Sequence, residues 1–193
     1  MVQASLSGGF LGADLQRMRE QLQGLPWIFE ATVRRRWPAA LEIHVVEQLP
    51  IARWGTDGFL NHEGGVFHTE REGDWESLPL LRGPDGSAPA LMAKYQRLLE
   101  KLAPLGLTVQ QLDVDERGQV DAVLAGGMRL ALGQEDFRER MQRFATIYRR
   151  ELAARRDQVT AVDLRYASGI AVRFSTPSPE GSPEVESSQV AGL

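Results

Sequence analysis

Residues 25–54 decide the fold and read LPWIFEATVRRRWPAALEIHVVEQLPIARW. Gly24 and Pro26 are expected to end a preceding helix, because proline has no backbone N–H to donate. Residues 31–36 and 41–45 each alternate with a period of two, which is typical of β-strands. One proline separates the two runs and a second follows them, so both strands are expected to be short. A helix followed by a β-hairpin, with no catalytic group inside, is typical of a docking module rather than an enzyme.

The helix ahead of the hairpin is predicted over residues 14–25. Its apolar residues recur every three or four positions and form one stripe, namely Leu15, Met18, Leu22 and Leu25. The hairpin is the nearest surface that this stripe can cover. One helix on two strands is a thin unit, and a lone hairpin is marginally stable in water. We therefore expect this segment to be the less stable part of the chain.

Residues 50–175 predict a larger β-rich domain, with an antiparallel sheet and two helices. Short strand patterns in this region are separated by turns that contain glycine. Amphipathic helices are expected over 88–105 and from about 134 to 157, and in the second of these Phe144 is predicted to be buried and Arg143 exposed. Because strands and helices do not alternate strictly, the predicted fold class is α+β.

The last predicted hairpin consists of AVDLRY (161–166), a three-residue turn and IAVRF (170–174). Its second strand is rich in β-favouring side chains and is expected at the edge of the sheet. An edge strand has free backbone N–H and C=O groups, so a partner segment can add to it as a further strand. The alternative interpretation, equally favoured by the sequence, is an ordinary edge strand that the tail, residues 176–193, covers. That tail is rich in Ser, Pro and Glu and is predicted to be disordered.

Composition limits the classes of function. A net charge of −4 over 193 residues argues against a dedicated nucleic-acid binder. The lack of cysteine excludes disulfides, zinc–thiolate sites and thiol nucleophiles. The sequence has no run of about 18 apolar residues that could cross a bilayer. Many arginines fall in the helix predicted over 134–157, but carboxylates are interleaved with them, so they indicate a solvated face that could steer an acidic protein partner.

Two groups of residues could carry chemistry. His62 and His68 flank a Gly-rich turn, but a metal site would require both to converge with a carboxylate. Exposed turn residues are the simpler interpretation. Asp113, Asp115 and Glu116 could supply an acid–base pair for hydrolysis, although solvated charges around a hairpin turn explain them more simply. No catalytic residue, cofactor or metal is predicted.

Several motifs resemble, in order and spacing, the periplasmic part of the bacterial cell-division family FtsQ, called DivIB in other bacteria. They are LPW, VRRRWP and VVEQLPIARWG within residues 25–55, and VDLRYASGIAVRF at residues 162–174. The resemblance implies a partial POTRA domain over 1–49, a partner-binding β domain over 50–175 and the tail 176–193. It also implies a periplasmic domain of a single-pass inner-membrane protein at the division septum. The family's transmembrane helix, and the first strand and helix of its POTRA domain, are expected to be absent from this chain.

The resemblance also implies a function, that of a non-enzymatic scaffold linking early and late division proteins during septal peptidoglycan synthesis. The POTRA part would contact other division proteins. The β domain would bind FtsB and FtsL, with FtsB adding as a strand along the last β-strand. The family's binding block and the edge-strand pattern together give the predicted partner-binding residues Arg165, Tyr166, Ser168, Gly169, Ile170, Val172 and Phe174. The resemblance adds Arg117, which matches a basic turn position that contacts an acidic FtsB residue in some relatives.

One of these positions departs from the family pattern, because Phe174 stands where relatives often have Trp. It keeps an aromatic ring but lacks the indole N–H donor. Two alternative functions stay open from the sequence. One is a POTRA-bearing subunit of an outer-membrane assembly or secretion machine, and the other is a carboxylate-dependent hydrolase.

Overall fold

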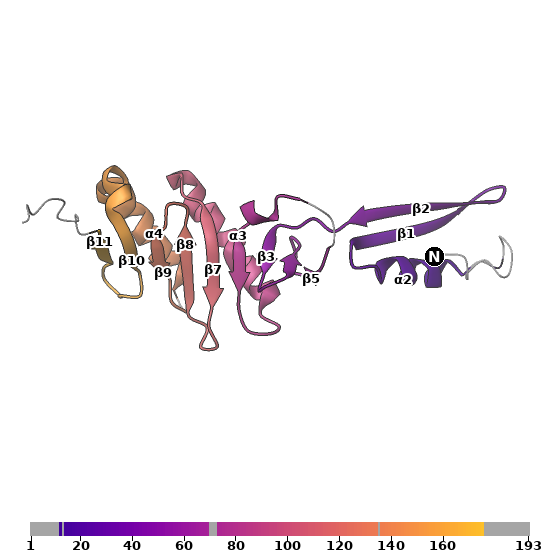
Figure 1. The fold of residues 1–193 in the computed structure, drawn as a ribbon, viewed down its shortest axis with the longest axis horizontal. Helices are drawn as coiled ribbons and strands as arrows, with labels where there is room; N and C mark the ends of the chain where they lie inside the picture. Colours follow the sequence, from indigo (N-terminus) through magenta and orange to yellow (C-terminus); the bar gives the residue numbers. More distant parts are fainter. Residues whose placement is uncertain (1–11, 13, 70–72, 135, 176–193) are drawn as a thin grey trace, which may run out of the picture.

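The computed structural model describes residues 12, 14–69, 73–134 and 136–175. The molecule is elongated, with a helix and hairpin at one end and a long sheet making up the rest (Figure 1). The hairpin is a two-stranded sheet, and the remaining strands form one nine-stranded sheet. No helix in the described ranges is long and apolar enough to cross a membrane. The predicted tail, 176–193, lies outside the described residues.

The hairpin unit consists of α2 (Leu15–Gln23), β1 (Ile28–Arg36) and β2 (Ala40–Glu47). Asp14 caps α2, since its carboxylate accepts a hydrogen bond from the Arg17 backbone N–H at 3.0 Å. The two strands pair antiparallel, with Ala31 opposite Val45. Met18 of α2 is buried, and a small core forms between the helix and β1 from Leu22, Ile28 and Ala31. The predicted helix and hairpin are therefore confirmed.

The nine-stranded sheet has the strand order β11-β10-β9-β8-β7-β6-β3-β4-β5. Two 3₁₀ turns, η2 (Trp75–Ser77) and η3 (Ala103–Leu105), lie in its connections. The strands are β3 (Ala52–Trp54), β4 (Gly58–Leu60), β5 (Val66–Phe67), β6 (Leu80–Arg82), β7 (Val109–Val114), β8 (Val120–Leu124), β9 (Arg129–Ala131), β10 (Val159–Asp163) and β11 (Ala171–Phe174).

The predicted α+β class is confirmed, but the sheet is mixed rather than wholly antiparallel. The pairs β3–β6, β6–β7 and β9–β10 are parallel. Parallel neighbours need a crossover connection, and helices supply two of them. Helix α3 (Ala88–Leu102) joins β6 to β7, and α4 (Phe137–Ile147) joins β9 to β10 through a π-helical turn, η4 (Tyr148–Leu152), and η5 (Ala153–Gln158).

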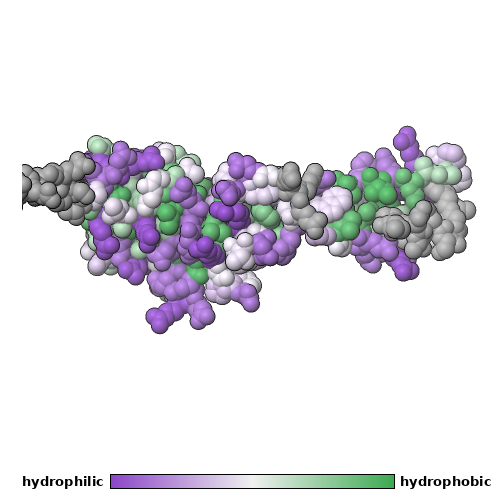
Figure 2. Space-filling view, viewed as in Figure 1, coloured by the Kyte–Doolittle hydropathy of each residue, from purple (hydrophilic) through white to green (hydrophobic). Residues whose placement is uncertain are grey.

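The two helices cover only one face of this sheet. On that helix-covered face, Leu112, Ala122, Leu130 and Val162 lie side by side on β7 to β10, and all four are buried. Phe144 of α4 packs in the same core and is 0% exposed, as predicted. The opposite side, called here the open face, carries polar residues such as Asp113, Asp121 and Arg129 together with small and aliphatic ones at the alternate positions. Figure 2 shows that hydrophilic side chains predominate over this part of the sheet.

A few contacts join the hairpin unit to the sheet. The rings of Phe29 on β1 and His62 on the turn after β4 lie 5.1 Å apart. The Asn61 side-chain amide donates a hydrogen bond to Gln48 Oε1 at 3.0 Å. Gln48 follows β2 and donates its own N–H to the Trp27 carbonyl at 2.9 Å. The junction is thus a short, partly aromatic contact beside the linker.

Candidate partner-binding edge

Strand β11 forms one end of the nine-stranded sheet. It pairs antiparallel with β10, with Val172 opposite Val162 and Arg173 opposite Ala161. Within the part of the chain that the structure describes, no strand lies on its other side. The predicted edge position is therefore confirmed. An uncovered edge presents a row of backbone donors and acceptors to which another chain can pair.

The backbone groups that point away from the sheet can be assigned from neighbouring hydrogen bonds. The Ser175 N–H donates to the Gln158 carbonyl at 2.7 Å, toward the β10 side. The Arg173 carbonyl also faces that side, because it accepts from the Thr160 hydroxyl at 3.1 Å. Successive strand residues turn their N–H and C=O groups to opposite sides. The N–H and C=O groups of Val172 and Phe174 therefore face outward.

The side chains of this strand divide between the two faces of the sheet. Val172 lies beside buried Val162, so it belongs to the helix-covered face together with Ile170 and Phe174. Phe174 is 37% exposed. The Arg155 guanidinium lies 4.3 Å from the centre of its ring, a cation–π contact that holds the ring against the end of η5. The edge thus offers an aromatic and aliphatic strip beside free backbone groups.

The loop that leads into β11 is fixed at its start by an ion pair. The Arg165 Nε and Nη2 atoms donate to the two carboxylate oxygens of Asp163 at 2.9 and 2.6 Å. This hydrogen bonding lowers the pKa of the Asp163 carboxyl below its usual value and raises the pKa of Arg165. Arg165 is thereby held beside Asp163 at the start of the loop.

Arg143 of α4 fixes the rest of this loop. Its guanidinium donates to the Tyr166 carbonyl at 2.9 Å and to the carbonyl of Ala167. The prediction that Arg143 is exposed is therefore wrong, since it is partly buried and holds the loop backbone. Tyr166 itself is 59% exposed. Because its backbone is held, its ring is available to a partner with less loss of entropy on binding.

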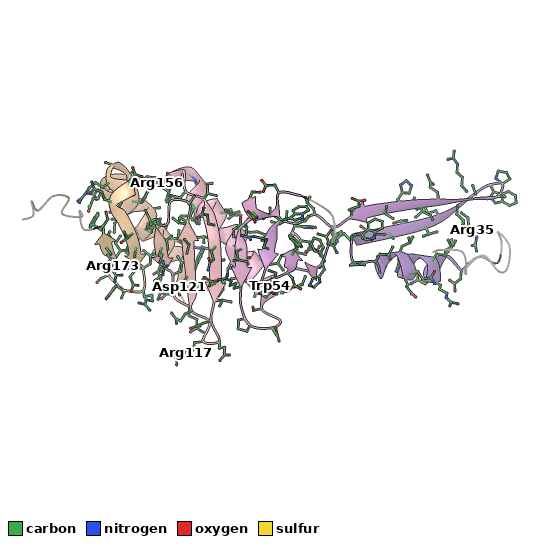
Figure 3. All side chains as sticks on the ribbon, in the orientation of Figure 1. Arg35, Trp54, Arg117, Asp121, Arg156 and Arg173 are labelled. Atoms are coloured by element: carbon green, nitrogen blue, oxygen red, sulfur yellow. The ribbon has the colours of Figure 1, made fainter. Side chains whose placement is uncertain are left out.

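Arg117 lies on the β7–β8 turn, at the same end of the sheet as the β10–β11 loop (Figure 3). The Asp115 carboxylate shapes this turn by accepting from the backbone N–H groups of Arg117 and Gln119, at 2.9 and 2.8 Å. Strand β9 lies between the two turns in the strand order. The structure therefore brings Arg117 to the same ends of the strands as the β10–β11 loop, but not next to the edge strand.

The carboxylates considered for hydrolysis do not gather at one point. Asp115 and Glu116 belong to the turn, whereas Asp113 lies directly opposite Asp121 on the open face. Partial burial raises the pKa of Asp121, and Asp113, Asp115 and Asp163 add to this effect while Arg165 opposes it. Asp113 accepts from Gln111 at 2.6 Å through one oxygen, and its other oxygen is buried without a partner among the described residues. Of these carboxylates, Asp113, Asp121 and Asp163 line an open hollow of about 510 Å³ whose lining includes no His, Ser or Thr.

The histidines also stay apart. His62 approaches Glu63 at 3.9 Å, and His68 approaches a different carboxylate, that of Asp57, at 3.8 Å. Over the described ranges, no three His, Cys, Asp or Glu side chains come close enough together to hold a metal ion.

Sequence reasoning missed the residues that support the edge. Asp163, Arg143 and Arg155 each touch the edge strand or its loop, yet none was a predicted site residue. Asp163 and Arg165 are two apart in the strand predicted over 161–166, and this spacing was a signal that both lie on the same face. No local sequence pattern could show that Arg143 of α4 contacts a loop more than twenty residues later in the chain.

Known proteins match most of the chain. Residues 52–165 match the family model "Cell division protein FtsQ/DivIB, C-terminal", and residues 1–48 match "POTRA domain, FtsQ-type". A protein of Xanthomonas campestris named Cell division protein FtsQ is 39% identical over 164 residues, which cover 85% of this chain and 59% of that protein. The proteins of the same name in Allochromatium vinosum and Shewanella oneidensis are 39% and 37% identical, over 91% and 89% of this chain and 70% and 65% of their own lengths. The chain thus spans about three fifths to seven tenths of these relatives.

Proposed function

Because the chain belongs to the FtsQ/DivIB family of cell-division proteins, we propose that it is a non-enzymatic scaffold of the division machinery. In this role it binds FtsB and FtsL and links early and late division proteins during septal peptidoglycan synthesis. It does so as the periplasmic domain of a single-pass inner-membrane protein at the septum. The family supports the cell-division role, and the edge strand supports the mode of binding.

The observation that carries the binding mode is the edge of β11, beside which no further strand of the described residues lies. A segment of FtsB adds as a further strand, and its backbone pairs with the outward N–H and C=O groups of Val172 and Phe174. Main-chain hydrogen bonds of this kind supply affinity for any extended segment. Side chains beside the edge then select the partner.

The predicted partner-binding residues take different parts in this mode. Tyr166 and Phe174 are the exposed aromatic anchors, the residue type that often carries interface energy. Ile170 and Val172 provide the apolar strip of the helix-covered face. Ser168 and Gly169 form the loop between these groups, and Arg165 and Arg117 lie along the same end of the sheet. Because Arg117 lies on the β7–β8 turn, away from β11, it contacts the partner only where the partner chain extends beyond the β10–β11 loop.

The two parts of the chain divide the work. Residues 50–175 form the partner-binding unit, and residues 1–49 form a separate POTRA-type unit that contacts other division proteins. In support, the hairpin unit and the nine-stranded sheet have separate cores and share no strand pairing among the residues that the structure describes.

The test uses binding of the purified chain to the periplasmic segment of FtsB from the same bacterium. Tyr166→Ala and Phe174→Ala are each expected to weaken binding by about 2 kcal/mol, roughly thirtyfold. Val172→Pro is expected to abolish binding, since it removes an outward N–H. Val172→Ala keeps that N–H and is the matched control for it, and Glu63→Ala at a distant exposed turn controls for the other two. Circular dichroism must show that every variant is folded. Parent-like binding by Tyr166→Ala, Phe174→Ala and Val172→Pro would rule out this edge as the FtsB site.

A further inference from the structure

Arginine is the charged residue that β11 itself contributes to the open face. Ala171 and Arg173 alternate with Val172 and Phe174, so they lie on the side away from the helices. Arg173 is exposed, and the picture places it at the end of the sheet (Figure 3). A strand added beside β11 would therefore have one of its open-face side chains next to this guanidinium.

A second arginine extends this positive charge inward. Ala161 on β10 is opposite Arg173 on one side and opposite Arg129 on the other. The two arginines are thus in one row, two strands apart, or about 10 Å. The alanine between them has a small side chain, and both guanidinium-bearing residues line the hollow on the open face.

Neither arginine has a carboxylate within ion-pair distance in the described part of the chain. The acidic residues of the open face occupy the neighbouring row, where Asp163 is opposite Ala171 and Ala131, and Asp121 is opposite Ala131. Asp163 is already engaged by Arg165 through both of its oxygens. The charge of Arg173 at the edge is therefore left for a partner.

The region of the chain around the edge strand also carries a net positive charge. Residues 136–175 contain nine arginines and five carboxylates, whereas the whole chain has a net charge of −4. An acidic segment is attracted to this end of the molecule and is less attracted elsewhere.

Building on the proposed function, we infer that the segment added beside β11 alternates between apolar and acidic side chains. Its apolar positions pack on the strip formed by Val172 and Phe174. Its acidic position faces Arg173 on the open face, with Arg129 behind it. Arg173 is thus a specificity-determining residue, because it selects an acidic residue at one position of a strand that the backbone alone would accept in any sequence.

The experiment measures binding of the periplasmic FtsB segment to four variants, at two salt concentrations. Arg173→Glu is expected to weaken binding roughly tenfold or more and to reduce the dependence of binding on salt. Arg129→Glu is also expected to weaken binding, but by less. Arg173→Lys keeps the charge and is expected to bind within about threefold of the parent. Arg97→Glu makes the same charge change on exposed α3, away from the edge, and is expected to bind like the parent.

A charge swap completes the test. Each acidic residue of the FtsB segment is replaced by Lys, and one such change is expected to restore binding to Arg173→Glu while weakening binding to the parent. Parent-like binding by Arg173→Glu, with Val172→Pro still inactive, would overturn the inference and leave strand addition standing. A loss that no charge swap restores would overturn it as well. Parent-like binding by Val172→Pro, Tyr166→Ala and Phe174→Ala would instead rule out this edge as the FtsB site, and this inference with it.

Discussion

The hairpin unit and the nine-stranded sheet use the same alternating pattern but bury very different amounts of it. In the sheet, apolar residues of β7 to β10 are covered by α3 and α4 and are almost fully buried. In the hairpin, Ile43 and Val45 are opposite Val33 and Ala31 on the face that α2 packs against, yet each is 43% exposed. One helix covers β1 and leaves β2 open, and Figure 2 shows hydrophobic side chains at this end. Burial therefore depends on how many elements are available, not on the strand pattern alone.

The largest expected effect comes from emptying the core of the sheet. Phe144→Ala removes a ring that is 0% exposed and is expected to destabilise the protein by about 3–5 kcal/mol, because it leaves a cavity. Chemical denaturation followed by circular dichroism measures this change. Gln142→Ala, exposed on the same helix, is the control and is expected to stay within about 0.5 kcal/mol of the parent. Equal effects from the two variants would contradict the packing of α4.

The same kind of change in the hairpin core should act locally. Ile28→Ala is expected to cost about 2 kcal/mol, near the lower end for such a change, because a core this small can partly collapse around the gap. Hydrogen exchange should show faster opening of β1 and β2, with β7 to β10 unchanged. Val46→Ala, on the other face of β2, is the matched control. A parallel loss of protection in both parts would show that they unfold as one unit.

A smaller effect is expected from the ion pair on the open face. The pKa of Asp163 is lowered in the folded state, so its contribution to stability is present above the unfolded pKa and is lost as pH falls through the folded value. Asp163→Asn is expected to cost about 1 kcal/mol at pH 7, since the pair is bidentate but partly exposed. Melting temperatures from pH 7 to pH 3 should converge for parent and variant. A gap that stays constant with pH would mean that the carboxylate charge is not responsible.

The smallest expected effect is a gain in stability rather than a loss, and it comes from replacing Asp121. Its pKa is raised, so the folded state carries a cost above the folded pKa that disappears as pH falls through it. Asp121→Asn removes the repulsion from Asp113 directly across the strand pair and is expected to stabilise the sheet by a few tenths of a kcal/mol at pH 7. The gain should shrink toward acid pH in the same melting series. Asp85→Asn, on an exposed turn, is the control, and an equal gain there would point to net charge instead.

Much of the fold could be predicted, because local patterns specify it. Proline and glycine positions gave the ends of α2 and of the hairpin, and the three-to-four-residue spacing of apolar side chains placed Phe144 in the core. The edge position of β11 was predictable as well, since it is the last strand pattern in the chain. The parallel strand pairs could not be predicted. The alternating pattern of a strand does not show whether its neighbour runs parallel or antiparallel, and a crossover connection decides this.

For the candidate edge, the sequence by itself determined which residues alternate on β11 and that aromatic side chains flank its loop. Only the tertiary structure decided that Arg143 holds that loop, that Arg155 covers Phe174 and that Arg129 shares a row with Arg173. The physical reason is the range of the forces involved. Backbone preferences and hydrophobic periodicity act between neighbours a few positions apart, whereas these contacts join residues that meet only after helix α4 has returned the chain to the edge of the sheet.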